Sequence, residues 1–336
     1  MTRMAAIGDL SLQLGGVLTG AQLAYVTYGT LAPDGRNAVL LTHGYTSSHL
    51  FADGGAAASE GSWGELVGPG KAIDTERFFV VSSNMLGSAF GSTAPSSIDP
   101  ASGREYGPDF PEITLRDIVA AQKRMLDGLG VKGLVAVVGP SYGGFQAFTW
   151  GAEYPGFMKG LVPVVTGLKA PGMDVDGLQR RLATDPNWNG GHYYRVGGIL
   201  PTMAAIRGET VRRYGAEEGL RPKLKDQSAI DAEIARQARA WAEAFDGHSL
   251  LVLGRAANRY DALPDLGKIR AKVMFVLSRT DALFPPALAE TVMPALAAAG
   301  IAARYVEIDS PHGHIASGAD AGKWAPDLAA FLDGLA

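Results

Sequence analysis

Short apolar runs alternate with segments of helical periodicity over most of the chain. Runs of this length, built mainly of Val, Leu, Ile and Phe, are typical of strands that are covered on both faces of a sheet. Strands are predicted on this basis at residues 38–42, 78–81, 134–138, 161–165, 272–277 and 304–308.

Helices are predicted between and after these strands. The clearest begins at Thr114, after which Leu115, Ile118, Val119 and Met125 lie along one stripe. Further helices are predicted over residues 145–150, 287–299 and 326–335. Alternating strands and helices indicate βαβ units, so the fold class is α/β with a mostly parallel central sheet.

Two regions depart from this alternation. Near the start, residues 11–14 and 21–28 alternate apolar and polar side chains around paired glycines, which favours antiparallel strands at a sheet edge. Residues 167–265 contain no run that resembles a buried parallel strand, and helices are predicted there at 202–214 and 228–245. We interpret 167–265 as a helical lid insertion, and 1–166 with 266–336 as the core that it covers.

Composition narrows the function classes. The 336 residues carry a net charge of −4, which gives no general attraction to nucleic acid or to an anionic membrane. No apolar segment approaches the length of a membrane span, and the first ten residues lack the apolar centre of a signal peptide, so a cytoplasmic protein is expected. The chain has no cysteine, which excludes a thiol nucleophile. Without an HExxH-like spacing, no metal or other cofactor is predicted.

The candidate chemistry begins with Ser141. It lies between Gly139 and Gly143, directly after the predicted strand 134–138 and before a predicted helix. A serine flanked in this way on a strand-to-helix turn is the pattern of a nucleophile elbow, in which small neighbours permit a sharp, strained turn. The alternative is a Gly-rich loop with no catalytic role. It explains the pentapeptide 139–143 but not its position between a predicted strand and a predicted helix.

A serine nucleophile needs a base and an acid that orients the base. In folds with a nucleophile elbow, the acid follows the serine along the chain and the histidine follows the acid. Asp281 follows the predicted strand 272–277, at the edge where parallel sheets place their active sites. Only His312 and His314 come later in the chain, directly after the last predicted strand. Both are candidates for the base from their position alone.

The tetrahedral intermediate of acyl transfer needs two hydrogen-bond donors for its oxyanion. One is expected to be the main-chain N–H of Tyr142, the residue after the nucleophile. The other is expected from the loop after the strand 38–42, where Tyr45 is the candidate.

Many segments, in order along nearly the whole chain, resemble the homoserine O-acetyltransferase family of the α/β-hydrolase superfamily. They are residues 24–31, 68–75, 83–87, 91–97, 109–114, 185–188, 284–286 and 310–314. The resemblance implies an α/β-hydrolase fold with a helical lid, an acyl intermediate on Ser141, and Asp281 and His314 as its partners. It favours His314 over His312, and it implies a homodimer joined through the lid as a possible assembly.

The departures from this family fall where an acceptor substrate should bind. Met203 stands where the family has a lid arginine for the homoserine carboxylate, and Thr210 stands where it has a tyrosine. Ile315 replaces an aspartate that would hold the amine. Arg207, four residues after Met203 on the same helical face, is a candidate to replace the arginine.

These observations predict a serine-dependent acyl-transfer enzyme for a small-molecule acyl substrate. An amino acid substrate would be poorly held if the protein offered no opposite charge to its carboxylate or to its amine. Hydrolysis of carboxylic esters or related acyl compounds is therefore the favoured hypothesis. The first alternative is a homoserine O-acetyltransferase-like enzyme with acetyl-CoA as a co-substrate. The second is a non-catalytic ligand-binding member of the fold. The residues alone do not separate ester, amide and carbon–carbon bond cleavage.

Overall fold

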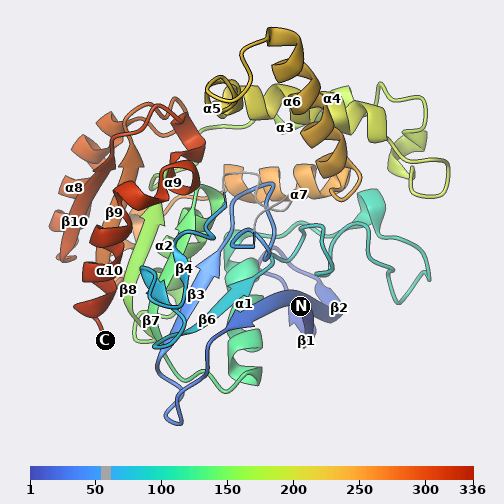
Figure 1. Cartoon of the computed structure of the whole chain (residues 1–336). Coiled ribbons are helices and arrows are strands. Elements are labelled where there is room, and N and C mark those ends of the chain that lie inside the picture. The colour runs from blue at the N-terminus through green and yellow to red at the C-terminus, as the bar shows by residue number, and fades with distance from the viewer. Residues whose placement is uncertain (54–61) are drawn as a thin grey trace.

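The computed structural model describes residues 1–53 and 62–336. An eight-stranded sheet crosses the molecule, with helices packed on both of its faces (Figure 1). The strands in spatial order are β1 (Arg3–Ser11), β2 (Val17–Tyr28), β6 (Phe79–Ser83), β3 (Ala38–Thr42), β7 (Leu134–Pro140), β8 (Met158–Val164), β9 (Lys272–Ser278) and β10 (Ala303–Ile308). From β6 to β10 every neighbouring pair is parallel, which confirms the predicted α/β-hydrolase fold.

The two faces of the sheet bury two separate apolar clusters. One contains residues of α1 (Leu115–Gly128), α2 (Tyr142–Glu153) and α8 (Ala289–Ala298). The other contains residues of α9 (Ala316–Ala319) and α10 (Ala325–Asp333). The central strands are buried throughout, as expected for strands that are covered on both sides.

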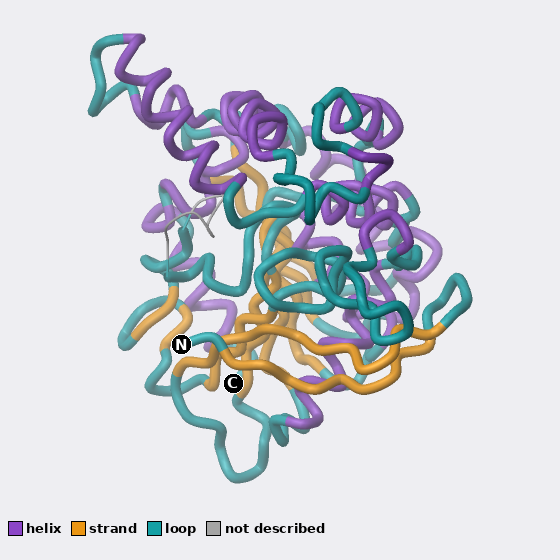
Figure 2. Tube along the Cα trace, turned by 90° about the vertical axis from the view of Figure 1, so that its right-hand side faces the viewer, coloured by secondary structure: helices purple, strands orange, loops and turns teal. Residues whose placement is uncertain are grey.

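Local sequence signals explain where these elements begin. Thr114 caps α1: its hydroxyl accepts from the N–H of Asp117, whose carboxylate accepts from the N–H of Thr114. The predicted early strand at 11–14 is wrong in position, since β1 ends at Ser11. Gly15 and Gly16 both have positive φ, and this turn connects β1 to its antiparallel neighbour β2 along the side of the molecule (Figure 2).

Residues 167–265 form helices above the carboxyl ends of the parallel strands (Figure 1). They are α3 (Val175–Leu182), α4 (Leu200–Arg213), α5 (Ala216–Leu220), α6 (Gln227–Ala242) and α7 (Gly247–Asn258). We call α3–α6 the helical insertion. Helix α7 lies between it and the sheet: Leu250 and Leu251 pack in the apolar cluster of the insertion, whereas Val252 and Leu253 pack in the main core.

Candidate active site

Ser141 lies at the turn from β7 into α2. Its backbone has φ 55° and ψ −119°, a conformation that L-residues rarely adopt and that persists only where the surroundings hold it. The neighbouring strand supplies that support, because the N–H of Ser141 donates to the carbonyl of Val164 at 2.8 Å. The hydroxyl of Thr166 donates to the carbonyl of Ser141 at 2.9 Å. The predicted sharp turn is therefore present and held from the next strand.

The two glycines around Ser141 are required by a close approach of β3. A Cβ added at Gly139 would lie 2.4 Å from the main-chain oxygen of Thr42, and one added at Gly143 would lie 2.2 Å from the same atom. The hydroxyl of Thr42 also donates to the carbonyl of Gly143 at 2.9 Å. Any larger residue at either position would push the elbow away from the sheet.

Asp281 and His314 are brought together at the same edge of the sheet, after β9 and β10. His314 Nδ1 lies 2.8 Å from Asp281 Oδ2, and neither side chain is more than 1% exposed. The other carboxylate oxygen of Asp281 accepts from the N–H groups of Leu283 and Phe284, which fixes its orientation. A carboxylate in this position holds the imidazole with its proton on Nδ1 and leaves Nε2 to act as an acceptor.

The second imidazole nitrogen of His314 is buried, and no described residue forms a hydrogen bond with it. The ring is enclosed by Tyr214 at the end of α4, with ring centroids 5.0 Å apart, and by Phe284 at 5.7 Å. His312 is the other candidate base, and its Nδ1 forms no hydrogen bond with Asp281 or with any other described residue. Its main chain instead lies against Gly215, next to α5 of the insertion.

The loop after β3 is fixed from two sides. The carbonyl of His43 accepts from the side-chain amide of Gln146 at 3.1 Å. The carbonyl of Gly44 lies 2.8 Å from Nδ1 of His43, whose Nε2 lies 2.9 Å from Asn84 Oδ1. Burial lowers the pKa of His43 to about 4, so the ring is neutral near pH 7. In a trans peptide the N–H points opposite to the C=O, so holding the carbonyl of Gly44 also sets the direction of the N–H of Tyr45.

A cavity of about 550 Å³ lies between the sheet edge and the helical insertion. Its described lining includes Phe284 but neither Asp281 nor His314. Ser141, Tyr142 and Tyr45 line it from the core, and Arg207 and Tyr214 line it from α4. The described lining includes neither Met203 nor Ile315.

Met203 is only 2% exposed and packs within the apolar cluster of the insertion. Ile315 is half-buried, and its side chain lies near Gly219 of α5. The contribution of Met203 and Ile315 to a substrate site stays a prediction.

Arg207 is the buried cation of this cavity, 5% exposed. Its guanidinium donates to the hydroxyl of Thr46 at 3.1 Å and lies 5.1 Å from the centre of the Trp241 ring. Tyr214 was not predicted as a site residue. Tyr214 follows Arg207 by seven residues, about two helical turns, and both line the cavity.

No group of three His, Asp or Glu side chains within residues 1–53 and 62–336 is arranged to hold a metal ion. Over the same residues, no helix is both long enough and apolar enough to cross a membrane.

Comparison with known proteins agrees with this architecture. Residues 37–318 match the family model of the alpha/beta hydrolase fold. The chain is 36% identical to a homoserine O-acetyltransferase of Moorella thermoacetica, over 91% of this chain and 88% of that protein. It is also 36% identical to a homoserine O-succinyltransferase of Methylibium petroleiphilum, over 91% of this chain and 86% of that protein.

Two solved structures superimpose over almost the whole chain. The crystal structure of esterase E22 has a TM-score of 0.87 at 26% identity and covers 99% of both chains. The homoserine O-acetyltransferase of Bacillus anthracis has a TM-score of 0.86 at 24% identity, over 99% of this chain and 97% of that one, a likeness of fold. The chain belongs to the α/β-hydrolase fold family and, within it, to the homoserine O-acetyltransferase family that its sequence resembles.

Proposed function

We propose that this protein is an acyl-transfer enzyme that works through an acyl intermediate on Ser141. The observation that carries the proposal is the Asp281–His314 pair at 2.8 Å, buried at the sheet edge that also presents the strained Ser141 to the cavity. Serine is a weak nucleophile unless a neighbouring base takes its proton, and a carboxylate-oriented imidazole is such a base.

In the first half-reaction, His314 Nε2 takes the proton of the Ser141 hydroxyl as its oxygen attacks the acyl carbon. Asp281 stabilises the imidazolium that forms. The oxyanion is bound by the N–H groups of Tyr45 and Tyr142, and His314 returns the proton to the leaving group as the carbon–leaving-group bond breaks. An acceptor hydroxyl then repeats the sequence on the acyl-serine and releases the product.

The leading acceptor is an alcohol that carries a carboxylate, with homoserine as the first compound to test. The curated relatives, which are homoserine O-acyltransferases, favour this reaction over the hydrolysis that the sequence favoured. Arg207 adds support, because a buried guanidinium in the cavity offers charge-assisted hydrogen bonds to a carboxylate. The acyl donor in such a reaction is an acyl-CoA, as co-substrate.

Hydrolysis is the second candidate, with water as the acceptor. The specific observation in its favour is Ile315, which follows His314 and offers no charge to an amino group. The similarity to esterase E22 also supports it.

Two measurements test the proposal. A fluorophosphonate probe should label the wild type and Ser278→Ala but not Ser141→Ala. Ser278 is a matched control because it is also a buried serine at the carboxyl end of a strand, with a hydroxyl that bonds to no described residue. Labelling of Ser141→Ala at the wild-type rate would refute the acyl-serine mechanism.

The acceptor is then identified with acetyl-CoA and p-nitrophenyl acetate, each with and without homoserine, serine or a simple alcohol. Release of CoA that depends on homoserine, with O-acetylhomoserine as product, supports transfer. Acetate as the only product under every condition supports hydrolysis and rejects the leading acceptor.

A further inference from the structure

The two residues proposed to bind the oxyanion share a feature in their side chains. Tyr45 and Tyr142 stack on each other, with ring centroids 5.9 Å apart and ring planes inclined by 16°. Both line the cavity beside Ser141.

Both phenol groups reach the same helix. The hydroxyl of Tyr45 donates to the main-chain carbonyl of Leu250, and that of Tyr142 donates to the carbonyl of Leu253 at 3.2 Å. Both acceptors belong to α7. A carbonyl oxygen has two lone pairs, so each can accept a tyrosine hydroxyl in addition to its bond within the helix.

Both tyrosine hydroxyls keep the proton that they donate to α7. Burial raises the pKa of both Tyr45 and Tyr142, so neither ionises near neutral pH. Gly254 allows the approach, because a Cβ at that position would lie 3.2 Å from the hydroxyl oxygen of Tyr45.

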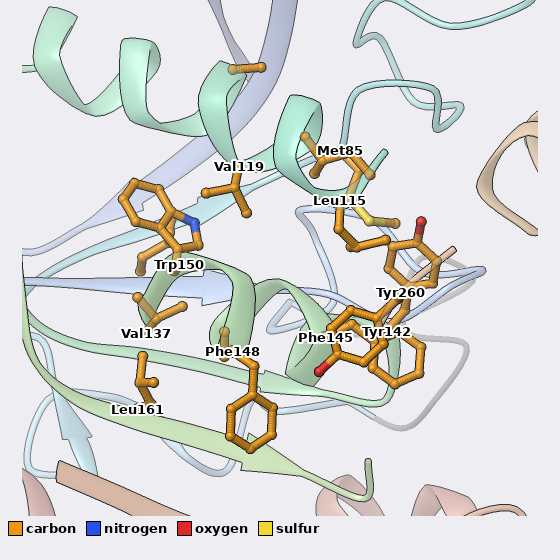
Figure 3. Packing of buried hydrophobic residues seen from close by; sticks show 14 of the residues in the cluster. Met85, Leu115, Val119, Val137, Tyr142, Phe145, Phe148, Trp150, Leu161 and Tyr260 are labelled. Carbon is orange, nitrogen blue, oxygen red and sulfur yellow. The ribbon is translucent and has the colours of Figure 1, made fainter. Parts of the chain in front are cut away.

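Helix α7 is a firm support for these bonds. Val252 and Leu253 are buried in the main core, and Leu250 and Leu251 are buried in the cluster of the insertion. Tyr142 also packs against Phe145, which stacks on Tyr260 at 4.4 Å (Figure 3). Movement of either tyrosine ring would therefore break its hydrogen bond to α7 and disturb the packing of the neighbouring aromatic rings.

We propose that the hydroxyl groups of Tyr45 and Tyr142 are positioning groups, which tie both proposed oxyanion donors to α7 and so hold their main-chain N–H groups in the geometry that the transition state needs. The inference rests on the proposed function. Oxyanion stabilisation depends on donors that are already in place when charge develops, so a loosened donor should lower the rate of the chemical step more than substrate binding.

The test uses Tyr45→Phe, Tyr142→Phe and the double variant, which remove only the hydroxyls. The matched control is Tyr260→Phe: its hydroxyl also donates to a main-chain carbonyl, that of Gly167 at 3.2 Å, but Tyr260 supplies no proposed oxyanion donor. The readouts are kcat and KM for p-nitrophenyl acetate, the rate of fluorophosphonate labelling, and the urea midpoint of unfolding.

We expect kcat to fall about tenfold in each single variant and further in the double variant. The loss should be smaller than the hundred- to thousandfold loss caused by deleting one oxyanion donor, because the donors are loosened and not removed. KM should stay unchanged, and the labelling rate should fall in parallel with kcat. The Tyr260→Phe control should keep its kcat while its urea midpoint falls like those of the others.

Wild-type kcat in both single variants would overturn the inference, and so would an equal loss of kcat in Tyr260→Phe. Either result, with a wild type that still labels at Ser141, leaves the proposed function standing. A wild type that does not label at all would instead refute the proposed function.

Discussion

The sheet edge and the helical insertion both line the cavity, but they hold their side chains in different ways. The side chains of Asp281 and His314 are at most 1% exposed, and they lie in the loops that follow the neighbouring parallel strands β9 and β10. On the insertion, Arg181 of α3 and Glu209 of α4 form a pair across the two helices with side chains 38% and 58% exposed. Exposed pairs of this kind contribute little to stability.

This difference separates two tasks. Groups that move protons must keep a fixed distance from one another, and strand ends within one sheet supply that. Groups that choose a substrate must fit its shape and charge, and side chains on packed helices can change without disturbing the strands. We therefore expect substitutions at the sheet edge to change kcat, and substitutions on α4 to change the preference for an acceptor.

The largest expected effect is that of Asp281→Asn. Its amide would donate to His314 Nδ1 and force the proton onto Nε2, the atom that must accept from Ser141, so kcat should fall about ten-thousandfold with the fold retained. The measurement is kcat for p-nitrophenyl acetate, with circular dichroism to check folding. Asp309→Asn is the control, because Asp309 is exposed nearby and pairs with Arg279. A loss of less than tenfold would show that Asp281 does not orient the base.

A smaller effect is expected at His43. A neutral ring has one proton for two neighbouring oxygens, the carbonyl of Gly44 and the side-chain oxygen of Asn84. The amide nitrogen of Asn84 already donates to the carbonyl of Ala89 and to the hydroxyl of Ser92. Support of the N–H of Tyr45 through the carbonyl of Gly44 requires the proton on Nδ1, which ¹⁵N NMR of the imidazole can show.

Two substitutions separate the two ring nitrogens of His43. His43→Asn can place a donor near the position of Nδ1 and should keep kcat within about tenfold of wild type. His43→Gln can place one near Nε2 and should lose about a hundred- to thousandfold, as when an oxyanion donor is removed. Equal kcat in the two folded variants would exclude a role for the bond to Gly44.

The smallest effect is expected for Arg207→Met, which tests whether the helical insertion selects the acceptor. Loss of a charge-assisted bond should raise KM for a carboxylate-bearing acceptor about ten- to hundredfold and leave p-nitrophenyl acetate hydrolysis unchanged. Arg180→Met is the control, since Arg180 is exposed on α3. An equal rise in KM for a neutral alcohol would show that Arg207 shapes the cavity and does not select charge.

The strands and the nucleophile elbow could be predicted because their signals are local. A parallel strand shows its two covered faces as a continuous apolar run, and Gly139 and Gly143 are required by the close approach of β3 at one turn. Chain order predicted Asp281 with either His312 or His314, because parallel strands bring their carboxyl ends to one edge, and the family resemblance favoured His314.

The acceptor site depends more on how the helices pack. Met203, placed by the family resemblance, lies in an apolar cluster, and Arg207 lines the cavity. A helix shows which residues share a face, but the angle at which that face meets the core depends on packing against α6 and α7, which no local pattern contains. Tyr214 was missed for the same reason.

The sequence by itself determined the fold class, the elbow at Ser141 and the order of its two candidate partners, because these depend on periodicity and on chain order. Only the tertiary structure decided that Arg207 is buried at the cavity beside Trp241, and only it placed Tyr45 and Tyr142 on the carbonyls of α7. The bond from Tyr45 to Leu250 joins residues 205 positions apart. Contacts at that separation result from how packed elements meet, and the neighbouring residues of either partner carry no trace of them.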